Sequence, residues 1–191
     1  MGQRTQIILQ RVNKQGEKST QVYFMQWGIG RMMFLHLISL VQADFFRESW
    51  GESADFFKAM QLNHLEDTEL LDLKEHYEGE DLTKIQELLD NCDFSNPKEG
   101  AGVVFGKEFA NNNGGVFVRA TEYENEIKMS KTRLEYAFML GYEEGGEYDR
   151  WCSADEYAAT EDKNRHCDEQ FMAGFHGLMN HFGATDKGAA K

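Results

Sequence analysis

The stretch TQIILQRVNKQGEKSTQVYFMQW, residues 5–27, decides the fold prediction. Both of its ends are rich in Ile, Val, Tyr and Phe, the residue types that favour strands. A polar segment with one glycine, residues 13–19, joins the two ends. We therefore predict a long β-hairpin whose strands cover residues 5–12 and 20–27.

The chain then turns at Gly28-Ile29-Gly30 and enters an almost continuously apolar segment, residues 31–46. The length and hydrophobicity of this segment predict a central buried helix, with His36 in the core. The two glycines lie where a dinucleotide-binding fingerprint would start, but the third glycine position holds Met33 and no parallel strand–helix–strand pattern follows. A tight turn between strand and helix explains the glycines.

Residues 66–93 combine leucines at helical spacing with many acidic residues. This pattern predicts two amphipathic helices, and Asp81 fits the N-cap of the second one. The only proline, Pro97, marks a connecting loop over residues 94–102.

The C-terminal half predicts strands followed by helices. Short strands are expected at residues 103–105 and 116–121, and a clear one at residues 134–142, where apolar and aromatic residues alternate. Residues 153–156, Ser-Ala-Asp-Glu, fit a capping box and predict a helix start. A last helix is expected over residues 167–182. The residues of its predicted apolar face are Phe171, Phe175, Leu178 and Phe182.

This order of elements predicts an α+β fold with an N-terminal β-hairpin, central helices, a largely antiparallel sheet in the C-terminal half and C-terminal helices. We expect a single domain over residues 1–182 and a flexible tail over residues 183–191. Three cysteines, an odd number without a close pair, indicate reduced thiols. The longest apolar stretch, residues 32–41, is shorter than a membrane-spanning helix, so we expect a cytoplasmic protein without a membrane partner.

Charge is unevenly distributed along the chain, which has 33 acidic and 20 basic residues. The net charge is +4 over residues 1–42, −11 over residues 43–100 and −6 over residues 101–191. A net charge of −13 repels phosphate backbones and favours basic protein partners. An acidic surface that only maintains solubility is the alternative explanation.

The densest negative charge predicts a partner-binding face. Its candidate residues are Glu69, Asp72, Glu75, Glu78 and Asp81. Positive charge gathers on the N-terminal hairpin and on a second β segment, where it suggests contact with RNA. The candidate residues for that contact are Arg4, Arg11, Lys14, Lys18, Arg119, Lys128, Lys131 and Arg133.

Three glutamates, Glu122, Glu124 and Glu126, alternate along what the sequence predicts to be extended chain. A row of three carboxylates on one face would bind a divalent cation or imitate spaced phosphates, although a solvated strand end also explains it. No metal site and no cofactor are predicted. The nucleophile elbow, the P-loop, the zinc-metalloprotease helix and paired Cys-x-x-Cys motifs are absent from the sequence.

Several scattered segments resemble small phage or prophage proteins. They are residues 4–7 (RTQI), 26–31 (QWGIGR), 113–115 (NGG) and 138–143 (FMLGYE). In size, acidity and compactness the chain is similar to type II-A anti-CRISPR proteins. This resemblance implies a phage-encoded inhibitor that acts in the host bacterial cell. It would bind a CRISPR effector nuclease and interfere with guide RNA or target DNA engagement.

Two other functions stay open. The first is a guide-RNA-cleaving ribonuclease that is active when docked on the effector. Such an enzyme needs a general base, a general acid and a cation near the phosphate, and the sequence does not single out residues for these roles. The second is a phage structural or host-takeover interaction protein without catalysis.

Overall fold

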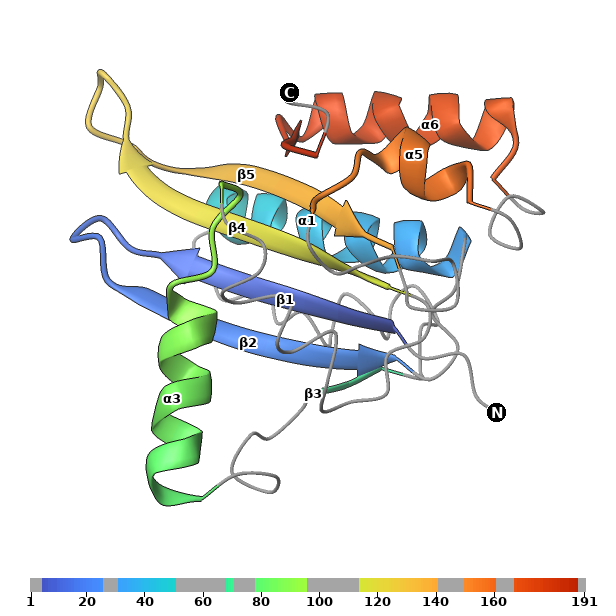
Figure 1. The fold of residues 1–191 in the computed structure, drawn as a ribbon. Helices are drawn as coiled ribbons and strands as arrows, with labels where there is room; N and C mark the ends of the chain where they lie inside the picture. The colour runs from blue at the N-terminus through green and yellow to red at the C-terminus, as the bar shows by residue number, and fades with distance from the viewer. Residues whose placement is uncertain are drawn as a thin grey trace.

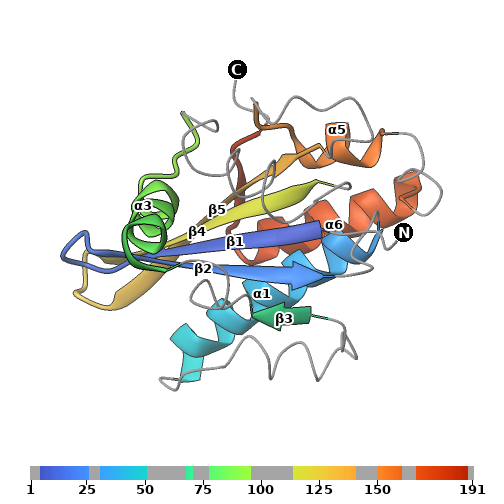
Figure 2. The ribbon, with the colours of Figure 1, turned by 60° about the horizontal axis from the view of Figure 1, so that its bottom comes forward.

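The computed structural model describes residues 5–25, 31–50, 68–70, 78–95, 114–140, 150–160 and 167–188. The described strands are β1 (Thr5–Val12), β2 (Lys18–Met25), β3 (Thr68–Leu70), β4 (Gly115–Glu124), β5 (Ser130–Met139) and β6 (Thr185–Asp186). The described helices are α1 (Arg31–Trp50), α3 (Gly79–Asp90), α5 (Ala154–Ala158) and α6 (Glu169–His181). Together they form three layers, with a sheet between α3 on one face and α1, α5 and α6 on the other (Figures 1 and 2). The predicted α+β fold is confirmed.

Two antiparallel hairpins, β1–β2 and β4–β5, make up most of the sheet. They join through β1 and β4, which run parallel, so the described strands form a mixed six-stranded sheet in the order β3-β2-β1-β4-β5-β6. The predicted N-terminal hairpin is therefore present. The sheet as a whole is less antiparallel than predicted, because β1 pairs with β4 and β5 pairs with β6 in parallel. No local sequence pattern indicates the contact between the hairpins.

Strand β1 lies inside the sheet, between β2 and β4. Its residues Ile7, Ile8 and Leu9 are all fully buried, since one face of the strand meets α1 and the other meets the α3 side. A strand covered on both faces needs a continuous apolar run instead of alternation. This explains the Ile-Ile-Leu sequence.

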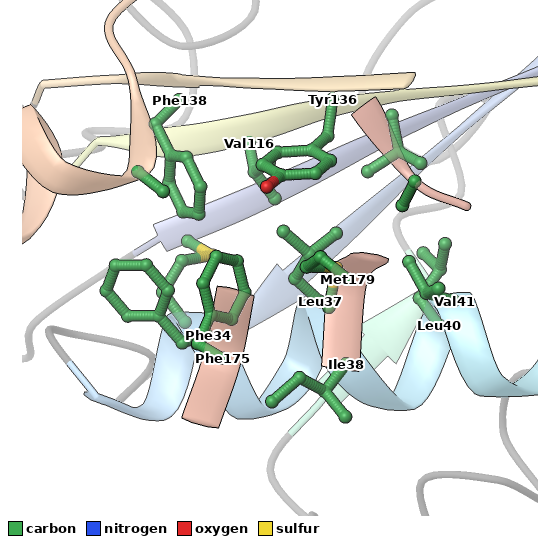
Figure 3. Packing of buried hydrophobic residues seen from close by; sticks show 14 of the residues in the cluster. Phe34, Leu37, Ile38, Leu40, Val41, Val116, Tyr136, Phe138, Phe175 and Met179 are labelled. Atoms are coloured by element: carbon green, nitrogen blue, oxygen red, sulfur yellow. The ribbon is translucent and has the colours of Figure 1, made fainter. Parts of the chain in front are cut away.

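An aromatic core fills the space between the sheet and the helices α1, α5 and α6 (Figure 3). The Phe34 ring of α1 lies 5.1 Å from the Phe138 ring and 4.8 Å from the Phe175 ring, measured between centroids. His36 is 3% exposed, which confirms its predicted place in the core. Its Nδ1 lies 2.7 Å from the carbonyl oxygen of Met32, one helical turn away.

Both C-terminal helices begin with a side-chain cap. Ser153 Oγ accepts a hydrogen bond from the Glu156 amide at 3.1 Å, which confirms the predicted helix start. Asp168 Oδ1 accepts one from the Phe171 amide at 2.8 Å at the start of α6. The predicted apolar face of α6 is partly wrong. Leu178 is 38% exposed. The helix face that is buried carries Met172, Phe175 and Met179 instead.

Residues 183–188, the described part of the expected tail, lie against the sheet. Residues 185–186 form β6, which pairs in parallel with β5, and the amide of Lys187 donates to the Tyr136 carbonyl at 2.7 Å. Ala184 is buried, and Asp186 Oδ2 accepts a hydrogen bond from the Ala154 amide at 2.8 Å. The small and polar residues of β6 carry no strand pattern in the sequence. The strand forms because it pairs with residues that are distant in sequence.

The acidic segment also differs from the predicted pair of helices. Among the described residues of this segment, 68–70 form β3, which pairs with residues 23–25 of β2, and α3 begins at residue 79. Glu78, not Asp81, occupies the N-cap position, and its side chain accepts no capping hydrogen bond. The predicted loop beyond residue 95, the predicted strand at 103–105 and the end of the predicted strand at 134–142 lie outside the described residues.

None of the described helices is long and apolar enough to cross a membrane.

Candidate interaction site

Helix α3 touches the sheet with only part of its length. Ile85 and Leu89 are buried against Ile8 and Phe117, and Leu82 is half-buried at the edge of this contact. The N-terminal half of the helix extends past β2, away from the body of the protein (Figure 1). The C-terminal half therefore anchors α3, and the N-terminal half presents its side chains to solvent.

Gln10 of β1 anchors the end of α3 through its carboxamide. Its Nε2 donates to the carbonyl oxygens of Leu89, Asp90 and Cys92 at 3.2, 3.0 and 3.3 Å. Leu89 and Asp90 belong to the last turn of the helix, where intrahelical donors run out, and Cys92 follows the C-cap residue Asn91. The side chain of one buried strand residue thus acts as a hydrogen-bond donor to the carbonyls at the C-terminal end of the helix.

Arg119 of β4 extends this network. Its Nε donates to Gln10 Oε1 at 2.8 Å, and its Nη2 donates to the Cys92 carbonyl at 2.8 Å and to Asp93 Oδ2 at 3.1 Å. The guanidinium also lies 5.2 Å from the Phe94 ring centroid. Register explains the arrangement, because Gln10 and Arg119 are direct partners across the parallel β1–β4 contact.

Asp93 completes the network as a carboxylate. Partial burial of the carboxyl raises its pKa, but hydrogen bonds from the amide and hydroxyl of Ser95, together with the Arg119 charge, hold the pKa below its ordinary value. Next to it, the Trp151 indole donates to the Asp93 carbonyl at 3.1 Å and stacks on Phe117. The segment after α3 is thereby bound to the sheet by charge, hydrogen bonds and ring contacts.

Strand β2 provides further contacts to the end of α3. Thr20 Oγ1 donates to Asp90 Oδ1 at 2.7 Å, and Lys18 Nζ donates to the Asp90 carbonyl at 3.0 Å. A cation at the C-terminal end of a helix also interacts favourably with the helix dipole. Side chains of β1, β2 and β4 therefore all hold the C-terminal end of α3 or the residues directly after it.

The outward side of α3 is acidic. Glu78, Glu80, Asp81 and Glu87 are all exposed. Within the described part of the chain, the only ion pair recorded for these four joins Asp81 to Lys84 at 3.8 Å. Acidic residues in the first turn stabilise the helix dipole and so favour the helix that carries them.

The structure separates the predicted partner-binding residues. Glu78 and Asp81 belong to the outward face of α3, whereas Glu69 lies on strand β3. Asp72 and Glu75 lie outside the described residues. Two acidic residues of this face, Glu80 and Glu87, were not among the predicted partner-binding residues. Their spacing of seven residues, about two helical turns, indicates that they share one face of a helix.

The predicted RNA-contacting residues do not form one patch. The guanidinium of Arg119 serves the network beneath α3, and its side chain is only 14% exposed. Lys14, in the β1–β2 turn, pairs with Glu124 at 3.1 Å, and Arg11 is half-buried at the end of β1. Arg4 lies outside the described residues.

The remaining candidates, Lys18, Lys128, Lys131 and Arg133, lie at or near the ends of the hairpins. Lys128 occupies the β4–β5 turn with a positive φ of 59°. Lys131 and Arg133 belong to β5, on the same side of the sheet as α3.

The predicted row of three glutamates is shorter than expected. Glu122 and Glu124 share one face of β4, but the strand ends at residue 124, and Glu126 lies in the turn that follows. Asn125 starts this turn, because its Oδ1 accepts from the amides of Ile127 and Met129. No group of His, Cys, Asp and Glu suited to hold a metal ion occurs among the described residues.

Ionisable groups on the opposite side of the sheet belong to the core or its rim. Burial raises the pKa of the Cys167 thiol to about 11, with a smaller opposing effect from Arg31, so this thiol is protonated at neutral pH. His176 Nε2 lies 2.8 Å from Asp155 Oδ1 in an exposed contact between α6 and α5. Neither group lies near α3, which separates them from the candidate interaction site.

Comparisons of the chain with protein-family models, with curated proteins and with solved structures gave no significant match.

Proposed function

We propose that this protein is a non-catalytic inhibitor that binds a basic, nucleic-acid-holding groove of a partner protein through the acidic outward face of α3. The observation that carries the proposal is the combination of an exposed acidic helix face with a helix end held by side chains of three strands. A helix fixed in this way loses little conformational freedom when it binds, which favours affinity.

The spacing of the charges agrees with this role. Glu80 and Glu87 are seven residues apart, which is about 10 Å along a helix axis. Phosphates of one nucleic-acid strand advance about 3.4 Å per nucleotide along the duplex axis, so the two carboxylates are separated like phosphates three steps apart. Asp81 and Glu78 add negative charge at the protruding end.

The resemblance to type II-A anti-CRISPR proteins makes a CRISPR effector nuclease the first partner to test. Such an effector holds its guide–target duplex in a positively charged channel and reads the adjacent motif with arginines. Acidic side chains on a protruding helix would compete for the same channel. The protein would then interfere with guide RNA or target DNA engagement inside the host bacterial cell.

Charge-neutralising variants test the proposal. Glu80→Gln together with Glu87→Gln removes two carboxylates from the α3 face, and Glu126→Gln with Glu169→Gln removes two exposed carboxylates elsewhere. In target-DNA cleavage by a purified type II-A effector, we expect the α3 double variant to inhibit about tenfold less well than the unchanged protein. The control variant should inhibit as well as the unchanged protein.

Two results would contradict the proposal. Equal loss in both double variants would show that total charge, not the α3 face, is responsible. Shortened guide RNA on a denaturing gel, after incubation of the protein with the loaded effector, would instead support the ribonuclease alternative. A pull-down from a CRISPR-bearing bacterium, with and without added nucleases, extends the search if the purified effector does not bind.

A further inference from the structure

The turns of the two hairpins lie side by side at one end of the sheet (Figures 1 and 2). Val12, the last residue of β1, pairs with Thr121 of β4, and the Lys14–Glu124 ion pair joins the hairpins beyond that point. The β4–β5 hairpin continues past its contact with β1, as far as the pairing of Glu124 with Ser130. Its end therefore projects from the sheet.

Side chains alternate between the two sides of the sheet along the strands of this projecting end, so basic and acidic residues lie on opposite sides. Tyr123 pairs with Lys131, and Thr121 pairs with Arg133, so all four side chains belong to the α3 side of the sheet. Glu122 and Glu124 alternate with them and therefore belong to the other side.

Strand β2 adds a further cation to the α3 side. Lys18 pairs with Val12, which in turn pairs with Thr121. This register places Lys18 in the same cross-strand row as Arg133. We call the surface made by Lys18, Tyr123, Lys131 and Arg133 the basic strip.

Aromatic and apolar groups accompany the cations. Tyr123 is 40% exposed, and the Arg133 guanidinium carbon lies 5.6 Å from the centroid of its ring. In the adjacent turn, Ile127 is 73% exposed and Met129 is 53% exposed. An exposed aromatic ring beside planar and flexible cations is the chemistry that binds bases by stacking and phosphates by charge.

We propose that the basic strip binds a short single strand of nucleic acid. A base stacks on Tyr123 while Lys131 and Arg133 contact the flanking phosphates, and Lys18, whose ammonium donates to the Asp90 carbonyl at 3.0 Å, adds positive charge at the edge of the strip. This site is separate from the acidic α3 face of the proposed function and does not depend on it. The net charge of −13 and the acidic helix on the same side of the sheet limit the contact to a few nucleotides.

An anionic membrane is the other surface that exposed Ile127 and Met129 beside lysines would suit. Insertion of the turn would carry Glu124 and Glu126 toward the anionic lipid, which repels them. A single strand lying along the α3 side of the hairpin avoids the Glu122 and Glu124 side chains. The arrangement of charges therefore favours nucleic acid.

Fluorescence anisotropy with a labelled oligouridylate of roughly ten nucleotides tests the proposal at about 50 mM salt. We expect measurable binding that Tyr123→Ala weakens about tenfold, because the stacked ring is lost. Tyr123→Phe, which keeps the ring, should bind like the unchanged protein. Lys131→Gln with Arg133→Gln should weaken binding and reduce the salt-dependence slope by about 1.4.

Lys84→Gln, which removes an exposed cation from α3, serves as the control and should bind RNA unchanged. Far-ultraviolet circular dichroism checks that each variant is folded. No binding at low salt, equal binding by Tyr123→Ala, or binding to phosphatidylserine vesicles in place of the oligonucleotide would overturn the proposal. The Glu80→Gln, Glu87→Gln variant should retain RNA binding, so failure of the strip and failure of the α3 face give different results.

Discussion

The two faces of the sheet are built on different physical principles. On the side of α1, α5 and α6, aromatic rings pack on one another around Phe34, and the contact is almost entirely apolar. On the α3 side, a smaller apolar cluster is supplemented by a directional network through Gln10 and Arg119. The first arrangement holds the fold together, and the second fixes the position of one helix.

This difference has consequences for stability. Apolar burial contributes in proportion to area and tolerates small shifts of side chains. A hydrogen-bond network contributes less in net terms, but removing one member leaves buried groups unsatisfied. We therefore expect changes on the first face to lower the stability of the whole protein, and changes on the second to release α3 first.

The largest expected effect is the loss of stability when a buried aromatic ring is removed from one or the other face of the sheet. Phe34→Ala removes a fully buried ring that contacts Phe138, Tyr157 and Phe175, and should lower the free energy of unfolding by about 3–5 kcal/mol. Phe94→Ala removes a half-buried ring on the α3 side and should cost less. Urea denaturation measures both, and an equal or larger loss for Phe94→Ala would contradict the distinction.

A smaller effect is expected from the network. Arg119→Met leaves Gln10, Asp93 and the Cys92 carbonyl without their shared donor, at a cost of about 1–3 kcal/mol. Hydrogen exchange should show faster exchange over residues 79–92 than over α1.

The matched control for this change is Arg133→Met. It removes an exposed guanidinium from the same sheet face and should leave α3 protected. Uniformly faster exchange in Arg119→Met would mean that α3 and the core unfold as one unit.

A better N-cap for α3 should raise the stability of that helix, by less than the losses above. Glu78 has the extended backbone of an N-cap but lacks the side-chain bond that Ser153 and Asp168 make for α5 and α6. Glu78→Ser should therefore stabilise α3 by about 0.5–1 kcal/mol. Slower hydrogen exchange in its first turn is the measurement, and the same gain in Glu78→Ala would show that lost charge, not capping, is the cause.

The smallest expected effect is a pH dependence confined to the α3 side. The pKa of Asp93 is lower in the folded state than its ordinary value. Its contribution to stability is therefore present above the ordinary value of 3.8 and is lost as the pH falls through the folded pKa. The contribution is small because the side chain is 43% exposed and solvent screens its charge.

Nuclear magnetic resonance measures this effect directly. Amide shifts at the end of α3 should titrate below pH 3.8, whereas those of the α1 core should not follow the same curve. Asp93→Asn should abolish the titration. Persistence of the curve in that variant would assign it to another carboxyl group.

The sequence predicted elements well where local patterns are strong. The N-terminal hairpin, the apolar helix α1 with His36 inside it and the Ser153 cap are all present. It failed at β3 and β6, which are three and two residues long, because such short strands carry no pattern of their own and exist through their partners.

The candidate sites were predicted only in part. Alternating charge around residue 122 is visible in the sequence, but the assignment of Tyr123, Lys131 and Arg133 to one side of the sheet depends on the β4–β5 register. Arg119 could not be recognised as an anchor of α3. Its partners, Gln10 and Asp93, lie 109 and 26 residues away along the chain.

By itself, the sequence determined the α+β class, the N-terminal hairpin, the buried helix and the acidic character of the segment that contains α3, because periodicity and composition are local properties. Tertiary structure alone decided the parallel pairing of β1 with β4, which joins the two hairpins, and the side of the sheet on which each charged side chain lies. Tertiary contacts also decided which part of α3 is anchored on the sheet and which part is exposed to solvent. These features depend on strand register and on contacts between distant residues, which no local pattern encodes.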